Sequence, residues 1–201
     1  MTELAQRRHG LESFLATCQE SEVGAVGVEI GIQPDLNHIN LRGNVSDKKF
    51  IAAAKSALGQ DLPVEANSIS VGEHQIFWLG PNEWLVITPI ADSTDLLAQL
   101  RESLSGLQNS VTDVSGGQIM MQLSGPGARD VLTTGCTLDF HPGVFKLGSC
   151  AQSGLAKANV LIGLTDNQPT FQIVVRRSFE EYLALWLRHA SREHRVRFNI
   201  V

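Results

Sequence analysis

Apolar and polar residues alternate along one glycine-rich stretch near the middle of the chain, and this pattern predicts two strands followed by a helix. Residues 111–114 form a short β-type run. Residues 119–123 alternate with the period of two that is typical of a half-buried strand. The Gly116–Gly117 pair between the runs predicts a tight turn. Pro126 is expected at the first helical position, where its missing amide hydrogen has no partner to lose. The helix should bury Ala128, Val131 and Leu132 and end at Gly135.

A fainter copy of this pattern lies upstream. Residues 39–43 resemble residues 121–125, because in both places an alternating strand runs into a glycine and then a helix. Ser46 is the expected N-cap of the upstream helix. Its apolar stripe comprises Phe50, Ile51, Ala54 and Leu58. We interpret the two copies as a duplication; chance similarity of two ordinary α/β segments is the alternative.

Each copy continues with a hairpin and a second helix. Residues 75–89 and 160–177 each contain two apolar strands joined by a polar turn, with helices expected from Ser93 and Ser178. Glu181, three residues after Ser178, indicates a capping box. The last helix carries one broad apolar stripe made of Phe179, Tyr182, Leu183, Trp186, Leu187 and Ala190. We therefore predict an α+β fold of duplicated β-α-β-β-α (ferredoxin-like) units, with mainly antiparallel sheets and helices on one face.

The same pattern predicts three segments. Residues 1–36 are expected to be an N-terminal leader packed on the body, residues 37–108 the first repeat lobe, and residues 109–201 the second.

Composition and charge exclude several classes of protein. The chain has 201 residues, 43% of them hydrophobic and 18% charged, with a net charge of −5, so it has no overall attraction to nucleic acid. No apolar run approaches the roughly 18 residues of a membrane helix. The first 15 residues contain acids and no apolar core, unlike a signal peptide. A basic cluster near the C-terminus is either a solvated helix end or an arm that meets an acidic partner; it comprises Arg188, His189, Arg192, His194, Arg195 and Arg197.

Motifs for independent chemistry are sparse. Three cysteines without CxxC spacing predict reduced thiols in the cytoplasm, and the scattered histidines predict no metal site. Cys136 and His141 are close enough in sequence to suggest a Cys–His pair, but Cys136 follows a helix C-terminus, where the dipole disfavours a thiolate, so structural roles are preferred. Asp113 could act as a base or a pterin contact. We favour turn chemistry, in which Asp113 and Ser115 bond nearby amides.

Aromatic and basic residues suggest a surface for a partner protein. Phe77, Trp78 and Trp84 lie within eight residues of one hairpin, and alternation places Phe77 and Trp78 on opposite faces. Aromatic residues concentrate at interface centres, although the second sheet face could equally be covered by the chain itself. Arg176 and Arg177, at the end of a strand, could pair with Glu180 or Glu181 or reach a partner. These five residues form the predicted partner interface.

Several motifs resemble known families. Asp113-Val-Ser115 with Leu123-Ser-Gly-Pro-Gly-Ala128 resembles the folate-binding aminomethyltransferase superfamily, which includes the glycine cleavage T-protein. Further segments resemble the gamma subunits of bacterial heterotetrameric sarcosine oxidases. These are Leu79-Gly-Pro-Asn-Glu-Trp-Leu-Val86, Gly135-Cys-Thr-Leu-Asp139 with His141-Pro142, Cys150-Ala-Gln152 and Arg176-Arg-Ser-Phe-Glu-Glu-Tyr-Leu183.

The second resemblance implies a non-catalytic subunit with no catalytic, cofactor-binding or metal-binding residues of its own. It implies alpha, beta and delta partner subunits, which would carry FAD, FMN, NAD and tetrahydrofolate, in a cytoplasmic enzyme that oxidises sarcosine. Three alternatives stay open: the equivalent subunit of a related N-methyl amino acid oxidising complex, a stand-alone folate-binding protein with a pterin between the two repeats, and a small regulatory binding domain with no enzyme partner.

Overall fold

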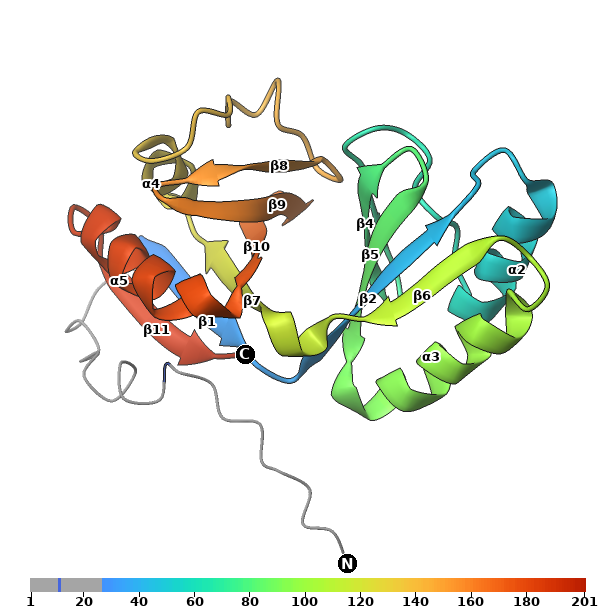
Figure 1. The fold of residues 1–201 in the computed structure, drawn as a ribbon. Coiled ribbons are helices and arrows are strands. Elements are labelled where there is room, and N and C mark those ends of the chain that lie inside the picture. The colour runs from blue at the N-terminus through green and yellow to red at the C-terminus, as the bar shows by residue number, and fades with distance from the viewer. Residues whose placement is uncertain (1–10, 12–26) are drawn as a thin grey trace, which may run out of the picture.

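The computed structural model describes Leu11 and residues 27–201, so most of the expected leader lies outside the described residues. Two sheets with helices on their outer faces form two lobes (Figure 1). We call residues 36–113 the first lobe. Residues 27–33 and 118–201 are the second lobe.

The first lobe is a five-stranded antiparallel sheet. Its order is β3 (Ile69–Val71), β4 (Gln75–Gly80), β5 (Glu83–Pro89), β2 (Leu36–Gly43) and β6 (Asn109–Asp113). Helices α2 (Lys48–Leu58) and α3 (Ile90–Ser103) cover one face. Of the predicted α2 stripe, Phe50, Ala54 and Leu58 are buried in the core between helices and sheet, and Ile51 is partly buried against the same core.

The second lobe is a six-stranded mixed sheet. Its order is β11 (Val196–Ile200), β1 (Val28–Gln33), β7 (Gln118–Ser124), β10 (Thr170–Arg176), β9 (Ala158–Asp166) and β8 (Cys150–Leu155). Only the β1–β11 pair is parallel among the described strands. Helices α4 (Ala128–Thr133) and α5 (Glu180–Ala190) complete the lobe. Ala128, Val131 and Leu132 are buried as predicted.

The two lobes repeat one topology. The series β2, α2, β4, β5, α3 in the first corresponds to β7, α4, β9, β10, α5 in the second, and both sheets place these strands in the same order. The predicted hairpins are β4–β5 and β9–β10. The α+β fold of duplicated, mainly antiparallel units is therefore confirmed.

The repeats exchange their first strands. β1 precedes β2 in the chain but pairs with β7 in the other lobe, and β6 precedes β7 but pairs with β2. The exchange makes one nearly continuous antiparallel ladder through both sheets, because the amide of Val114 donates to the carbonyl of His38 where the chain passes between them (2.8 Å). β1 lies within the expected leader and β6 within the expected second lobe, so the sheets do not follow the predicted segment boundaries.

Several predicted helix ends are wrong by a few residues. Asp47, not Ser46, caps α2, because its carboxylate accepts from the amide of Lys49 (2.8 Å). α3 begins at Ile90, directly after the extended Pro89, and not at Ser93. A 3-10 turn, η2 (Arg177–Phe179), replaces the capping box expected at Ser178.

Gly135 does not close α4, which ends at Thr133. A Cβ at Gly135 would lie 2.3 Å from Cζ2 of Trp186, so the glycine instead lets the indole of α5 pack closely. At the other end, α4 begins at Ala128, two residues after Pro126.

Candidate functional site

The inner faces of the two sheets meet at one end of the molecule. Phe77, Leu85 and Ile87 of the first lobe pack against Met120, Cys150, Leu161 and Val174 of the second. The predicted alternation of residues 119–123 places Met120 on the solvent face of a half-buried strand, and this placement is wrong because the other lobe covers Met120. We call this contact the closed end.

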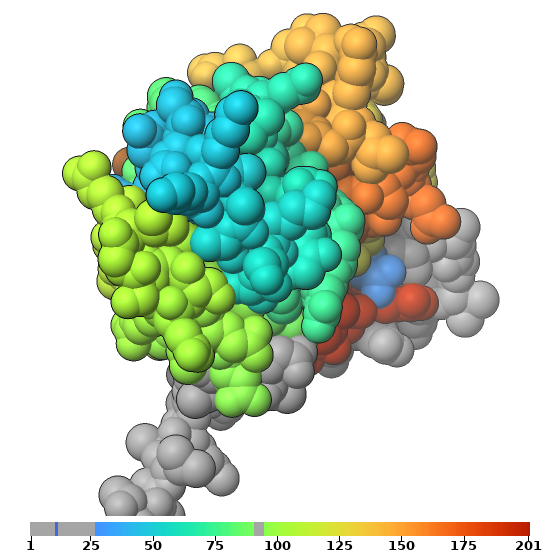
Figure 2. Space-filling model, turned by 90° about the vertical axis from the view of Figure 1, so that its right-hand side faces the viewer, coloured from blue at the N-terminus to red at the C-terminus, as the bar shows by residue number. Residues whose placement is uncertain are grey.

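Backbone hydrogen bonds fasten the closed end. The amide of Ile69 donates to the carbonyl of Gly148, and the amide of Cys150 donates to the carbonyl of Asn67, both at 2.8 Å. Figure 2 shows the segment before β8 lying against residues near β3. A Cβ at Gly163 would lie 2.4 Å from Cδ1 of Ile69 and 2.7 Å from Cε1 of Phe77, so only glycine allows this approach.

Cys150 is part of the same contact. The residue is 1% exposed, and its thiol donates to the carbonyl of Ser68 (3.3 Å). Burial raises the pKa of Cys150 to about 12, since a thiolate would lose its hydration there, while the backbone contact at Trp78 acts weakly in the opposite direction. Cys150 is therefore a structural, unreactive thiol at neutral pH.

Away from the closed end a cleft of about 810 Å³ opens between the lobes. Its apolar floor continues the closed end and is formed by Leu85, Val114, Leu161 and Val174. Polar and charged side chains from both lobes form its walls. We call it the interlobe cleft.

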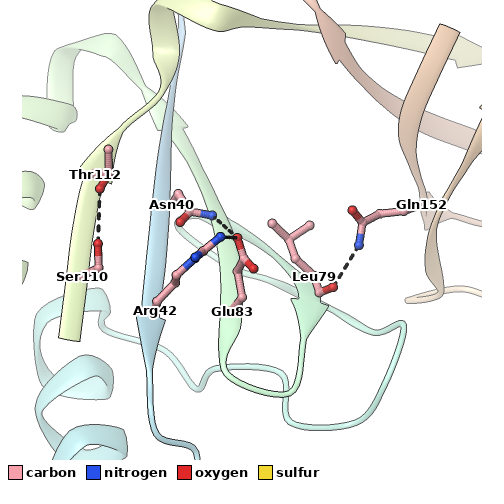
Figure 3. Close-up of polar contacts among 7 residues, drawn as sticks. All are labelled: Asn40, Arg42, Leu79, Glu83, Ser110, Thr112 and Gln152. Atoms are coloured by element: carbon pink, nitrogen blue, oxygen red, sulfur yellow. Dashed lines mark hydrogen bonds and ion pairs between the residues drawn. The ribbon is translucent and has the colours of Figure 1, made fainter. Parts of the chain in front are cut away.

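The first-lobe wall is organised around Glu83 (Figure 3). Oε1 of Glu83 accepts from Nη2 of Arg42 and from Nδ2 of Asn40, each at 2.8 Å. The register of β2 against β5 causes this convergence, because it places Arg42 directly opposite Glu83. From the second lobe, Nε2 of Gln152 donates to the carbonyl of Leu79 (2.9 Å) and joins the two walls.

The second-lobe wall is cationic. Lys157 lies in the β8–β9 turn, and Arg176 ends β10; both are exposed and line the cleft. Phe179 lies beside them and packs edge-on against Tyr182, with ring centroids 6.2 Å apart. The hydroxyl of Tyr182 accepts from the amide of Lys157 (3.3 Å), which ties the turn to α5.

The structure separates the five predicted interface residues. Phe77 is buried at the closed end, and Trp84 is buried beneath α2, where its ring stacks on Phe50. Neither side chain is accessible to a partner, because other parts of the fold cover both faces of the hairpin at these positions. Trp78 is half-buried, Arg176 lines the cleft, and Arg177 lies partly buried in η2.

Sequence reasoning missed the other cleft residues. Lys157 lies in a turn whose preceding Ala156 has a positive φ of 52°, a conformation that no sequence motif marks. Arg42 and Glu83 are distant in sequence, so their pairing depends on strand register. Phe179 was assigned to a buried stripe, but it is 38% exposed.

Asp113 and Ser115 serve the turn, as favoured from the sequence. Oδ1 of Asp113 accepts from both the amide and the hydroxyl of Ser115. Oγ of Ser115, itself buried, accepts from the amide of His38 in β2 (2.9 Å). The motif therefore pins the chain where it crosses between the lobes.

The Cys136–His141 sequence pair does not form a catalytic contact. The thiol of Cys136 donates to Oγ of Ser153 (3.5 Å), and Nδ1 of the exposed His141 accepts from the amide of Gly143 (3.1 Å). Within residue 11 and residues 27–201, no group of three or more His, Cys, Asp or Glu side chains could hold a metal ion. Among the same residues, no helix is long and apolar enough to cross a membrane.

Comparison with known proteins gives a consistent family. Residues 42–193 match the family model described as sarcosine oxidase, gamma subunit family. A sarcosine oxidase subunit gamma from Corynebacterium sp. (strain P-1) is 35% identical over 144 residues, which span 71% of this chain and 70% of that protein. One from an Arthrobacter species is 33% identical over the same shares.

Solved structures show the same fold. A chain of heterotetrameric sarcosine oxidase from Corynebacterium sp. U-96, solved with pyrrole 2-carboxylate, superposes with a TM-score of 0.83 and 28% identity, covering 93% of this chain and 95% of that one. The glycine cleavage system aminomethyltransferase T from Bartonella henselae shares the fold with a TM-score of 0.62 and 15% identity; the match covers 87% of this chain and 48% of that protein.

Proposed function

This chain belongs to the sarcosine oxidase gamma subunit family, and we propose that it acts as a non-catalytic assembly subunit of a heterotetrameric sarcosine oxidase. In this role it buries part of its surface against its neighbours and holds their orientation. The alpha, beta and delta subunits are its partners and carry FAD, FMN, NAD and tetrahydrofolate. No catalytic residue of the complex comes from this chain.

The proposed complex is cytoplasmic and oxidatively demethylates sarcosine to glycine. Oxygen is reduced to hydrogen peroxide, and the one-carbon unit passes to tetrahydrofolate or leaves as formaldehyde. One observation supports the assignment most. The structural match to one chain of a heterotetrameric sarcosine oxidase covers 93% of this chain and 95% of that one. Such a match supports the role of a subunit in a complex of this kind.

Coexpression tests the proposal. A tagged copy of this chain is produced alone and together with the other three subunits, and each preparation is examined by native mass spectrometry, flavin absorbance and sarcosine-dependent peroxide formation. We expect flavin and turnover only in the coexpressed complex. Sarcosine turnover by the chain alone, or failure of the chain to enter any complex, contradicts the proposal.

A second candidate is a stand-alone folate-binding protein. The interlobe cleft favours it, because a cleft of about 810 Å³ between two repeats of aminomethyltransferase fold is large enough for a pterin. Tetrahydrofolate at one hundred times its Kd would stabilise the isolated chain by about 2.7 kcal/mol. No shift of Tm at millimolar tetrahydrofolate eliminates this candidate.

A related complex that oxidises N-methylglutamate or dimethylglycine is a close variant of the first proposal. Its substrate would be recognised on other subunits. Activity of the purified complex with each N-methyl amino acid distinguishes these variants.

A further inference from the structure

We infer that the interlobe cleft receives an acidic segment of a partner subunit, with Lys157 and Arg176 binding its carboxylates and the apolar floor holding a neighbouring side chain. This inference rests on the proposed assembly function and adds where, and by what chemistry, the partner docks.

The first argument for an acidic partner is the charge of the cleft. The whole chain has 16 Lys and Arg against 21 Asp and Glu, yet the cleft is lined by three cations and one carboxylate. Arg42 already pairs with that carboxylate, Glu83. Among the described residues, neither Lys157 nor Arg176 has an ion-pair partner, so the cleft presents two uncompensated positive charges on an acidic protein. Complementary charge of this kind steers and selects a negatively charged partner.

The second argument is that aromatic residues surround the two cations and hold the wall in place. Arg176 and the exposed ring of Phe179 lie together at the second-lobe wall, and arginine and aromatic residues are enriched where interfaces bind most strongly. The aromatic contact with Tyr182 and the Tyr182–Lys157 hydrogen bond hold this wall in place before binding. A preformed wall reduces the entropy lost on association.

Exposure decides between a protein segment and a small anion. Sites for small molecules enclose about 70–90% of their ligand. Here Lys157, Arg176, Asn159 and Gln152 are all exposed, so the polar walls stand open to solvent. An extended segment can reach the apolar floor with one side chain while its acidic residues meet these walls.

Charge reversal tests the inference inside the complex. The double variant Lys157→Glu with Arg176→Glu is coexpressed with wild-type chain and the other subunits, and intact-mass analysis measures which copy enters the complex. We expect at least a tenfold preference for wild type, and a smaller salt sensitivity of the few variant complexes that form. The matched control reverses two exposed lysines on the outer face of the first lobe, Lys48→Glu with Lys49→Glu, and should compete equally with wild type.

The outcomes separate the two proposals. If the wild-type chain enters no complex, the assembly function itself fails. If wild type assembles and the cleft variant assembles equally well, or if the control loses as much as the cleft variant, only the docking inference is overturned. Equal Tm values for the three free chains establish that folding does not explain a loss. A raised Tm with millimolar succinate, together with unimpaired assembly of the cleft variant, would assign the cleft to a small anion and overturn the inference.

Photocrosslinking identifies the occupant directly. A photoreactive benzoylphenylalanine replaces Asn159, which is exposed and lines the cleft, and a second sample carries it in place of Gln99 on the outer helix α3. We expect irradiation of the complex to join position 159, and not position 99, to a partner peptide containing Asp or Glu. Capture of a segment without acidic residues, or no capture at position 159 in an intact complex, overturns the inference.

Discussion

The two lobes share a strand order but hold their longest connections by different chemistry. In the first lobe, the segment from α2 to β3 is fixed by a neutral indole. Nε1 of Trp84 donates to the carbonyl of Pro63 (2.7 Å), and the ring stacks on Phe50 with centroids 5.9 Å apart. The side-chain amide of Gln60 adds hydrogen bonds to the backbone of His74.

The second lobe uses a cation for the same purpose. Nη1 of Arg129, on α4, donates to the carbonyls of Phe140 and Phe145 in the segment from α4 to β8. The guanidinium lies 5.3 Å from the ring centroid of Phe171, which also contacts both phenylalanines. Burial lowers the pKa of Arg129 from its ordinary value.

The difference shows that the shared topology determines which connection of each lobe must be held in place. It does not determine which side chain holds that connection. One lobe relies on ring packing, and the other relies on a charge-assisted contact with carbonyl groups. The two anchors should therefore fail in different ways, while the exchanged strands should make the lobes unfold together.

The largest effect is expected at Cys150, where the lobes touch. With its pKa at about 12 against an ordinary 9.0, the thiolate fraction at pH 8 falls about a thousandfold. Iodoacetamide should therefore label the Cys150 peptide of the native protein about a thousandfold more slowly than that of the urea-unfolded protein, as read by mass spectrometry. Labelling at comparable rates would mean that the lobes part readily.

The raised pKa of Cys150 also makes the free energy of unfolding depend on pH. The folded-state pKa lies above the unfolded value, so the folded protein retains the proton longer as pH rises. The contribution of Cys150 is complete below about pH 9 and is lost as pH rises toward about 12. Cys150→Ala should remove this part of the pH dependence in urea titrations between pH 8 and 11; an unchanged slope would contradict it.

Replacing the first-lobe anchor should be the next most damaging change. Trp84→Ala is expected to lower the free energy of unfolding by about 3–5 kcal/mol, because a buried indole leaves a cavity. Trp84→Phe keeps a ring and loses the bond to Pro63, so we expect about 1 kcal/mol. Urea unfolding followed by circular dichroism should show one transition in both variants. Two separated transitions, with only one shifted, would show that the lobes unfold independently.

Replacing the second-lobe anchor should have a smaller effect. Arg129→Met keeps apolar volume but leaves the carbonyls of Phe140 and Phe145 without their donor, so about 2 kcal/mol should be lost. Arg101→Met is the matched control, because Arg101 also donates to a carbonyl, that of Val111, but from an exposed position. A loss below 0.5 kcal/mol is expected there. Equal losses would indicate that the partly buried guanidinium of Arg129 is not the anchor.

The smallest effect is expected at the ion pair in the cleft. The side chains of Arg42 and Glu83 are 60% and 30% exposed, so solvent screens their attraction, and Arg42→Ala should cost at most about 0.5 kcal/mol. Lys55→Ala, which removes the more exposed pair with Asp61, provides the comparison on the outer side of the same lobe. A loss above 1 kcal/mol for Arg42→Ala alone would show that Glu83 depends on Arg42 and not on Asn40.

The sequence could predict what depends on local pattern. The period-two runs and the polar turns found both hairpins, and the apolar stripe located α2, because neighbours in sequence carry those signals. The exchange of β1 and β6 was missed, since a strand gives no sign of which sheet receives it. The burial of Met120 and Phe77 depends on the opposite lobe, and the cleft combines residues more than one hundred positions apart.

Because the two repeats exchange their first strands, they are arranged like the two subunits of a strand-swapped dimer, but within one polypeptide. A single repeat would leave an empty place beside β2 or β7, which a second copy would fill with its own first strand. Fusion makes that encounter intramolecular, so each half finds its counterpart at a high effective concentration. A cut in the connection after α3 would accordingly yield fragments that complement one another instead of two domains that fold alone.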